Sequence, residues 1–217
     1  SAREVVLFYG CAESKKGLNE SMRGRESGMP VLEQWESYFD ADEVVQKLSQ
    51  HGQRDKCVEF GCGYGTFTLS AASLDDVRQI ASFDIDHDML KTTALRLGET
   101  AVAKKVVLSE RDFLADGCGL PDRWADWGMI FNLLHIEAAL DLLAEAHRVI
   151  RPGGVLAIIH WRRDIQTPRG PSMAIRPSQN QCQSWAEQVG FRFESAPTFE
   201  RNPWHWGLKM CRPAKMK

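Results

Sequence analysis

The sequence lacks several features that would place it in a specialised class of protein. Its six cysteines form no C-x-x-C pair, which disfavours a zinc site or a disulfide scaffold and favours a reducing cytosol. No stretch approaches the ~18 consecutive apolar residues of a membrane-spanning helix. The formal net charge of −2 gives no sign of a nucleic-acid or membrane surface. We therefore expect a cytoplasmic protein without a metal or a membrane anchor, acting on a small partner.

The composition is that of a globular protein. A chain of 217 residues usually forms one domain and can bury a substantial core. Residues 14–29 mix Lys, Glu, Arg, Gly and Ser without periodicity, which predicts a mobile arm over residues 1–29, with a lid over a ligand as the alternative. Residues 30–217 are expected to form one domain.

Strand-like and helix-like patterns alternate along the chain from residue 31, which predicts an α/β fold with a parallel, doubly wound sheet. Helices are expected from Val31, from Asp40 with Glu43 completing a capping box, and over Thr66–Ser73, His87–Leu97, Glu137–Ile150 and Ser178–Val189. Strands are expected at Cys57–Phe60, Arg78–Phe83, Val106–Leu108, Trp127–Phe131, Val155–Ile159, Phe191–Ser195 and Trp204–Cys211.

The most informative stretch, residues 56–68, reads K-C-V-E-F-G-C-G-Y-G-T-F-T. Gly61, Gly63 and Gly65 lie between a strand and a helix. Glycine tolerates positive φ and lets the backbone approach a ligand, and a helix N-terminus favours electronegative groups. The pattern predicts a nucleotide-type loop, although glycines alone are weak evidence.

The second strand ends in an acidic residue. Asp84 follows Gly65 by 19 residues, and a carboxylate at this place can hold two ribose hydroxyls. The alternative role, capping the next helix, suits Asp86 better.

Five segments in this order resemble class I S-adenosylmethionine-dependent methyltransferases over roughly residues 30–211. They read V-E-F-G-C-G-Y-G-T-F, F-D-I-D-H-D-M-L, D-F, D-W-G-M-I-F-N-L-L-H and H-R-V-I-R-P-G-G-V-L. The resemblance implies a three-layer sandwich around a seven-stranded sheet in the order 3-2-1-4-5-7-6, with an antiparallel seventh strand. It also implies that S-adenosylmethionine is bound and S-adenosylhomocysteine is released.

The resemblance assigns cofactor contacts residue by residue. Glu59 and the glycine loop would face the methionine part, Asp84 the ribose and Ile85 the adenine. Asp112 would accept from the adenine amino group, with Phe113 on the ring, while Asn132 and Leu133 would close over the methionine side. The implied cofactor set is thus Glu59, Gly61, Cys62, Gly63, Gly65, Asp84, Ile85, Asp112, Phe113, Asn132 and Leu133.

Candidate residues for catalysis and acceptor binding follow strands four and five. His135 and His160 should face the crevice at the carboxyl ends of the strands, where an imidazole can act as a general base. A histidine that caps a helix or packs is the alternative for each. Trp161 would wall the acceptor pocket, and Arg162, Arg169 and Arg176 would bind an anionic acceptor unless they form a solvated loop.

Other functions remain as alternatives. A dinucleotide-dependent oxidoreductase would carry G-x-G-x-x-G, whereas this chain has G-C-G-Y-G. A cofactor-binding regulatory protein without catalysis is the alternative from another class. Asn132-Leu133-Leu134-His135 does not match the N/D-P-P-Y motif of many nucleic-acid amino-methyltransferases, so we expect a small-molecule acceptor rather than nucleic acid or protein. A monomer and a homodimer are both compatible with the sequence.

Overall fold

A computed structural model describes residues 29–49, 54–98 and 100–214. The predicted arm lies outside these residues up to residue 28. Residues 29 and 30 lie over the glycine loop, because Tyr64 Oη–H donates to the Pro30 carbonyl (2.8 Å) and Met29 Cε lies 3.2 Å from where a Gly63 Cβ would be.

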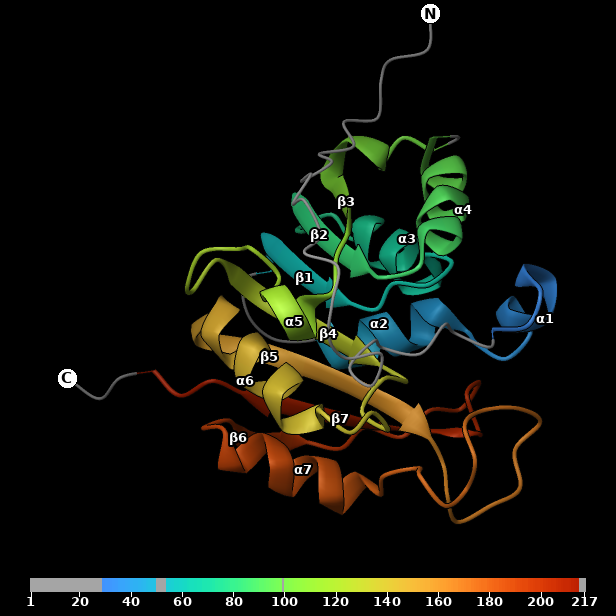
Figure 1. The fold of residues 1–217 in the computed structure, drawn as a ribbon, viewed down its shortest axis with the longest axis vertical. Helices are drawn as coiled ribbons and strands as arrows, with labels where there is room; N and C mark the ends of the chain where they lie inside the picture. Colours follow the sequence, from blue (N-terminus) through green and yellow to red (C-terminus); the bar gives the residue numbers. More distant parts are fainter. Residues whose placement is uncertain (1–28, 50–53, 99, 215–217) are drawn as a thin grey trace, which may run out of the picture.

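The described chain contains a seven-stranded sheet in the order β3-β2-β1-β4-β5-β7-β6, as predicted (Figure 1). β1 to β5 are parallel, and β7 is antiparallel to both of its neighbours. The strands are β1 (Lys56–Phe60), β2 (Gln79–Asp84), β3 (Val106–Glu110), β4 (Ala125–Phe131), β5 (Ile150–Trp161), β6 (Arg192–Ser195) and β7 (His205–Cys211).

Helices cover both faces of the sheet and give three layers (Figure 1). The apolar residues of α2, α3 and α4 form one buried cluster on one face, and those of α6 and α7 form a second cluster on the other. The helices are α1 (Leu32–Glu36), α2 (Ala41–Ser49), α3 (Thr66–Ala72), α4 (His87–Gly98), α5 (Phe113–Asp116), α6 (Ala139–Val149) and α7 (Gln179–Gln188), with a 3₁₀ turn η1 at Ala103–Lys105.

Two differences from the sequence prediction exceed a shift of one or two residues at the end of an element. The R-P-G-G segment, residues 151–154, is not a turn between helix and strand. It lies within β5, which already begins at Ile150. Gly153 there has φ 82°, and its amide donates to the Arg212 carbonyl (2.7 Å) beyond the end of β7. The second difference is α5, a four-residue helix (Phe113–Asp116) between β3 and β4, where the sequence predicts no helix.

The N-terminus of α2 forms only half of the predicted capping box. Asp40 Oδ1 accepts from the Glu43 amide (2.8 Å), as expected of an N-cap. The Glu43 carboxylate instead accepts from the amides of Glu200 (2.6 Å) and Arg201 (2.8 Å), far along the chain. This helix start is therefore used to hold the segment between β6 and β7.

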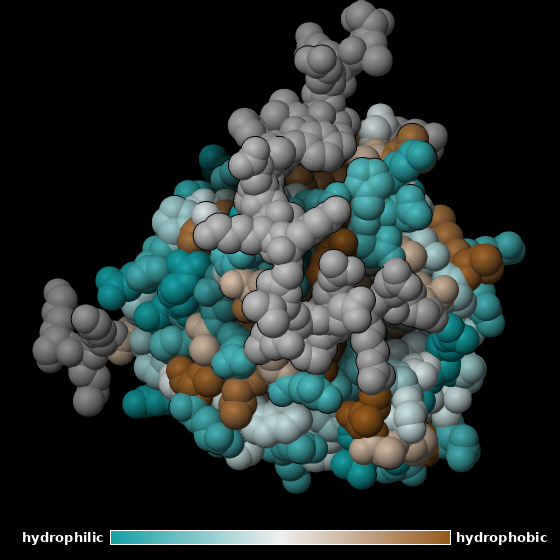
Figure 2. Space-filling model, viewed as in Figure 1, coloured by the Kyte–Doolittle hydropathy of each residue, from teal (hydrophilic) through white to brown (hydrophobic). Residues whose placement is uncertain are grey.

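The surface is mostly polar in the view of Figure 2, with hydrophobic residues in small groups between polar ones. Large exposed hydrophobic side chains belong to different elements: Val31, Leu95, Leu140, Ile175 and Phe193. Apolar burial is concentrated in the two clusters that flank the sheet, so the carboxyl ends of β1 to β5 stand at one well-supported edge. No helix in the described ranges is long and apolar enough to cross a membrane.

Candidate functional site

The glycine loop between β1 and α3 adopts the conformation that its sequence predicts. Gly61, Gly63 and Gly65 have backbone φ angles of 76°, 53° and 74°, in a region that residues other than glycine rarely adopt. A Cβ on Gly65 would stand 2.5 Å from Thr93 Cγ2 of α4, and one on Gly61 would stand 3.1 Å from Leu133. The loop thus needs glycine both for its backbone and for the space between neighbouring elements.

Hydrogen bonds hold the loop against the end of β2. The amides of Gly61 and Cys62 both donate to the Phe83 carbonyl (2.8 and 3.0 Å). The Gly63 amide donates to Asp84 Oδ2 (2.7 Å), and Thr93 Oγ1–H donates to the Gly63 carbonyl (2.8 Å). The loop is thereby fixed relative to the acidic residue with which it was predicted to act.

Asp84 ends β2 and lies almost entirely out of solvent. Its Oδ1 accepts from the Asp86 amide (3.0 Å), and Asp86 itself caps α4 by accepting from Asp88 and Met89. Burial raises the pKa of Asp84, against the effect of the Asp86 and Gly63 amides. A carboxylate has about four acceptor positions, so Asp84 can still accept from a ligand's hydroxyl groups.

Glu59 is buried below the loop, on β1. Thr68 Oγ1–H (2.5 Å) and Ser82 Oγ–H (2.9 Å) both donate to its Oε2. Burial outweighs these hydrogen bonds and, with the nearby Asp84 charge, raises the pKa of Glu59 to about 7. A cationic ligand group near Glu59 would favour its ionised form.

The predicted adenine contacts lie at the start of α5. Asp112 is its N-cap, with Oδ1 accepting from Leu114 and Ala115 (3.1 Å each), which leaves Oδ2 as an acceptor. The Phe113 ring packs edge-on against Phe60 of β1, with centroids 5.3 Å apart. Ile85 follows Asp84 and is partly exposed.

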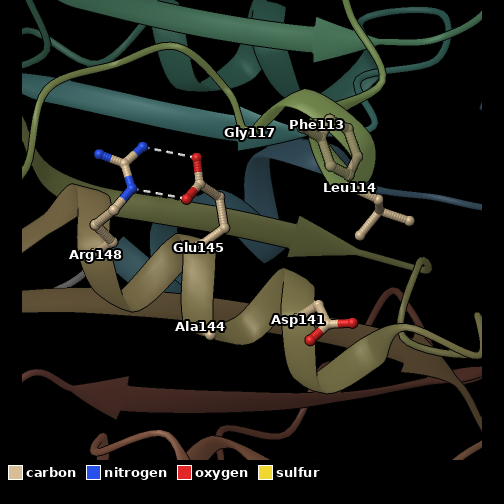
Figure 3. A pocket seen from close by; sticks show the side chains of 7 residues that line it. All are labelled: Phe113, Leu114, Gly117, Asp141, Ala144, Glu145 and Arg148. Atoms are coloured by element: carbon tan, nitrogen blue, oxygen red, sulfur yellow. Dashed lines mark hydrogen bonds and ion pairs between the residues drawn. The ribbon is translucent and has the colours of Figure 1, made fainter.

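A hollow of about 360 Å³ borders Phe113 between α5 and α6 (Figure 3). Two of its charged side chains bind each other: Arg148 forms a two-pronged ion pair with Glu145 and also donates to the Leu120 carbonyl (2.9 Å). Glu145 also accepts from the Cys118 amide (2.7 Å), and its bonds to Arg148 lower its pKa to about 2. This pair ties α6 to the preceding loop.

Asn132 and Leu133 follow β4, and the Leu133 side chain lies close to Gly61 of the glycine loop. Asn132 adopts φ 56°, and its amide donates to the Ile159 carbonyl (2.9 Å). Both polar atoms of its side chain are buried without a hydrogen-bond partner among the described residues. Because such groups cost free energy unless paired, Asn132 is suited to bind a polar group of a ligand.

The two predicted base candidates contact each other. His135 Nδ1 lies 3.3 Å from His160 Nε2, and His160 Nδ1 lies 3.2 Å from the Trp161 carbonyl oxygen. His160 is fully buried, and burial chiefly lowers its pKa to about 3. The sheet therefore brings together two side chains that are 25 residues apart in sequence.

Trp161 is buried on the opposite face of the sheet from His160, within an aromatic layer. Its ring lies 4.2 Å from His205 and 5.8 Å from Phe39, measured between centroids. Its position is that of a core residue beneath the carboxyl edge.

The predicted arginines do not converge on one point. Arg176 is buried and donates to the carbonyls of Pro171, Arg162 and Arg169 and to Thr167 Oγ1, so it holds its own loop together. Arg162 pairs with Asp164 through two bonds (3.1 and 2.6 Å). Arg169 is exposed on the same loop.

Sequence reasoning missed His205, the first residue of β7. It is 5% exposed, and neither ring nitrogen has a partner among the described residues. Burial chiefly lowers its pKa to about 3. The W-H-W sequence gives no sign of this burial, which depends on the pairing of His205 with Trp161 in the antiparallel register.

Replacing this histidine should stabilise the protein in acid. Its folded pKa lies below the ordinary 6.5, so its contribution to stability falls as the pH drops from 6.5 towards 3. We expect His205→Phe, which keeps the ring, to raise the free energy of unfolding at pH 5 by about 2 kcal/mol relative to wild type. Urea unfolding at pH 5 and pH 8 measures this. An equal gain in the free energy of unfolding at both pH values, or a loss confined to pH 5, would contradict this prediction. The control is His87→Phe, at an exposed site.

These residues fit S-adenosylmethionine at the level of their chemistry. A loop cradle that a Cβ would fill, a buried carboxylate at the end of β2 and the unpaired Asn132 side chain suit a ligand with a sugar and polar amino-acid groups. Among residues 29–49, 54–98 and 100–214, no group of three or more His, Cys, Asp or Glu is placed to hold a metal ion.

Comparison with known proteins agrees with this chemistry. The profile of a family described as "Methyltransferase domain" matches residues 58–158, which contain the glycine loop, Asp84, Asp112, Asn132 and most of β5. A probable cobalt-precorrin-6B C(15)-methyltransferase (decarboxylating) from Methanothermobacter thermautotrophicus is 30% identical over 79 residues, or 36% of this chain. The match spans 40% of that relative's length.

Solved structures share the fold at low sequence identity. A SAM-dependent methyltransferase from Aquifex aeolicus superimposes with a TM-score of 0.68 at 20% identity, over 81% of this chain and 91% of that one. The cyclase SpnF superimposes with a TM-score of 0.65 at 16% identity, over 80% of each chain. The fold is thus shared by proteins whose names describe different reactions, and the reaction must be argued from the site.

Proposed function

Because the chain belongs to the class I S-adenosylmethionine-dependent methyltransferases, we propose that it transfers the methyl group of this cofactor to a small-molecule acceptor. The observation that carries the proposal is the joint position of the glycine loop and Asp84. The Gly63 amide donates directly to the Asp84 carboxylate (2.7 Å), which holds the glycine loop beside the residue that the resemblance assigns to the ribose hydroxyls. Asn132 also supports the proposal, because its buried side-chain oxygen and nitrogen have no hydrogen-bond partner among the described residues.

The protein's part in this reaction is chiefly positioning. The bound cofactor supplies an activated methyl group on a sulfonium, which is displaced in line. Asp84 holds the sugar hydroxyls, while Glu59 and Asn132 hold the amino-acid end. Correct alignment of two reactants supplies on the order of 7 kcal/mol or more of the barrier, so covalent catalysis by the protein is unnecessary.

The acceptor is proposed to be small. The matched domain accounts for β1 to most of β5, and the described remainder completes the sheet rather than adding a second unit. An anionic acceptor draws no support from Arg162 or Arg176, since their donors bind Asp164 and the atoms of their own loop. Arg169 is exposed on the same loop, and its role in acceptor binding stays a prediction.

Cofactor titration tests the first half of the proposal. We expect calorimetry to show that S-adenosylhomocysteine and S-adenosylmethionine bind, whereas NAD does not. Binding of NAD alone would indicate the oxidoreductase alternative. A screen of small molecules with S-adenosylmethionine labelled in its methyl group tests the second half. Binding without label transfer to any class of acceptor would favour the regulatory alternative.

A further inference from the structure

The geometry of the contact between His135 and His160 indicates which ring nitrogens carry hydrogen. His160 is near the end of β5, and His135 comes from the segment that follows β4. The ring centroids are 5.4 Å apart with planes at 70°, so one ring meets the other edge-on through its nitrogen. A hydrogen bond between two imidazoles needs one donor and one acceptor, so its direction can be worked out.

The surroundings of His160 fix its tautomer. Its Nδ1 is 3.2 Å from the Trp161 carbonyl oxygen, which accepts but cannot donate, so Nδ1 carries the hydrogen. The side chain is fully buried, and its lowered pKa of about 3 keeps the ring neutral near pH 7. The neutral ring with hydrogen on Nδ1 leaves Nε2 as an acceptor. Trp206 stacks on this ring (6.1 Å between centroids, 24° between planes) and limits its rotation.

The tautomer of His135 follows from that of His160. Since His160 Nε2 is an acceptor, His135 Nδ1 must donate across the 3.3 Å contact. In neutral His135 the lone pair then resides on Nε2. The hydrogen bond at one ring nitrogen sets the function of the other, as it does in catalytic and metal-bound histidines.

We propose that His135 is the general base through Nε2 and that His160 is a positioning residue that holds His135 in this tautomer. This rests on the proposed methyl transfer. The acceptor atom forms a bond to the methyl carbon as the carbon–sulfur bond breaks, with both electrons passing to sulfur. The acceptor's proton passes to His135 Nε2, and the imidazolium later releases it to water.

The two histidines therefore have different roles. Burial disfavours a charge on His160, and the nearby Arg176 adds to this effect. His135 is only partly buried, so the role of base is assigned to this ring. The hydrogen bond to His160 Nε2 orients the His135 ring without removing its proton.

The tautomer can be measured before the acceptor is known. Long-range ¹H–¹⁵N spectra of ¹⁵N-labelled protein separate protonated from bare ring nitrogens, and a His135→Gln spectrum assigns the signals. Above neutral pH we expect His135 to carry hydrogen on Nδ1 in the full chain. A His135 ring with hydrogen on Nε2 in the wild type would overturn the proposal without any variant.

Variants of His160 test its positioning role. His160→Phe removes the acceptor, and we expect His135 to shift to a mixture of tautomers or to the Nε2–H form. His160→Gln offers a carbonyl oxygen to His135, so it should restore the Nδ1–H form. His87→Gln, at an exposed histidine paired with Glu110, should change nothing at His135. An unchanged tautomer in folded His160→Phe would overturn the role of His160.

Titration with S-adenosylhomocysteine separates this proposal from the proposed function. We expect the ligand to bind wild type and His160→Gln equally, within about twofold. A wild type that binds no ligand but shows the Nδ1–H tautomer would overturn methyl transfer and leave the positioning of His135 in place. The Nε2–H tautomer in a protein that binds the ligand would overturn the positioning alone.

Discussion

Asp84→Ala is expected to weaken the binding of S-adenosylhomocysteine by at least about 100-fold while leaving a folded protein. Asp84 is predicted to accept two ribose hydroxyls, and hydrogen bonds to a charged group are worth about 1.5–3 kcal/mol each. The same carboxylate accepts from the Gly63 amide at 2.7 Å, so its loss also releases the glycine loop. Calorimetric titration measures the affinity, and circular dichroism with thermal unfolding checks the fold.

A second substitution separates the two effects at Asp84. Asp84→Asn keeps an oxygen for the Gly63 amide but loses the charge towards the ribose. Wild type should prefer S-adenosylhomocysteine over its 2′,3′-dideoxy analogue, and this preference should vanish in Asp84→Asn. Asp88→Ala, at an exposed acid in the first turn of α4, is the matched control. Unchanged affinity in Asp84→Ala would refute the assignment of the ribose site.

The local parts of the site could be predicted from the sequence because their causes are local. Three glycines in alternation permit positive φ at each position, and all three have it. Asp86 and Ser178 cap the helices that follow them, through amides two or three residues away. The order of apolar strands and amphipathic helices similarly predicts the layers and, with the family resemblance, the strand order.

The remaining features depend on contacts that the local sequence pattern does not specify. Arg176 looks like an exposed cation in sequence, but the chain folds around it and its donors bind loop carbonyls. His205 becomes buried because β7 pairs with β5 so that His205 faces Trp161. The His135–His160 bond likewise needs the positions of two strand ends, and no spacing rule gives it. The two histidine cases depend on strand positions and register, and the Arg176 case depends on the path of its loop; a single sequence specifies neither.

Glu43 likewise makes contacts that the local sequence does not specify, and its replacement is expected to have the largest effect on stability. Sequence predicts it as half of a capping box, but the side chain holds the segment before β7. It accepts from the amides of Glu200 and Arg201 and from Asn202 Nδ2 (2.8 Å), and it pairs with Lys47 (3.1 Å). Asn202 in turn exchanges hydrogen bonds with the Asp40 backbone (2.9 and 3.1 Å).

The charge of Glu43 is held by these donors. Burial alone would raise the pKa of this carboxyl, but the amides of Glu200 and Arg201, with Asn202 and Lys47, lower it from 4.5 to about 2. A carboxyl whose folded pKa is lowered stabilises the fold above its unfolded pKa, and the contribution is lost as the pH falls from 4.5 towards 2. The shift corresponds to about 3 kcal/mol at neutral pH.

Glu43→Gln should therefore lower the free energy of unfolding by about 3 kcal/mol at pH 7, because a side-chain amide places a donor opposite a backbone amide. The difference between wild type and variant should shrink as the pH falls below 4.5, since the wild-type carboxyl then takes up a proton on unfolding. Urea unfolding at several pH values between 3 and 7 measures both effects. Glu33→Gln, at an exposed position of α1, should change stability by less than about 0.5 kcal/mol. A Glu43→Gln difference that stays constant down to pH 3 would show that packing, and not the ionised carboxylate, holds the segment before β7.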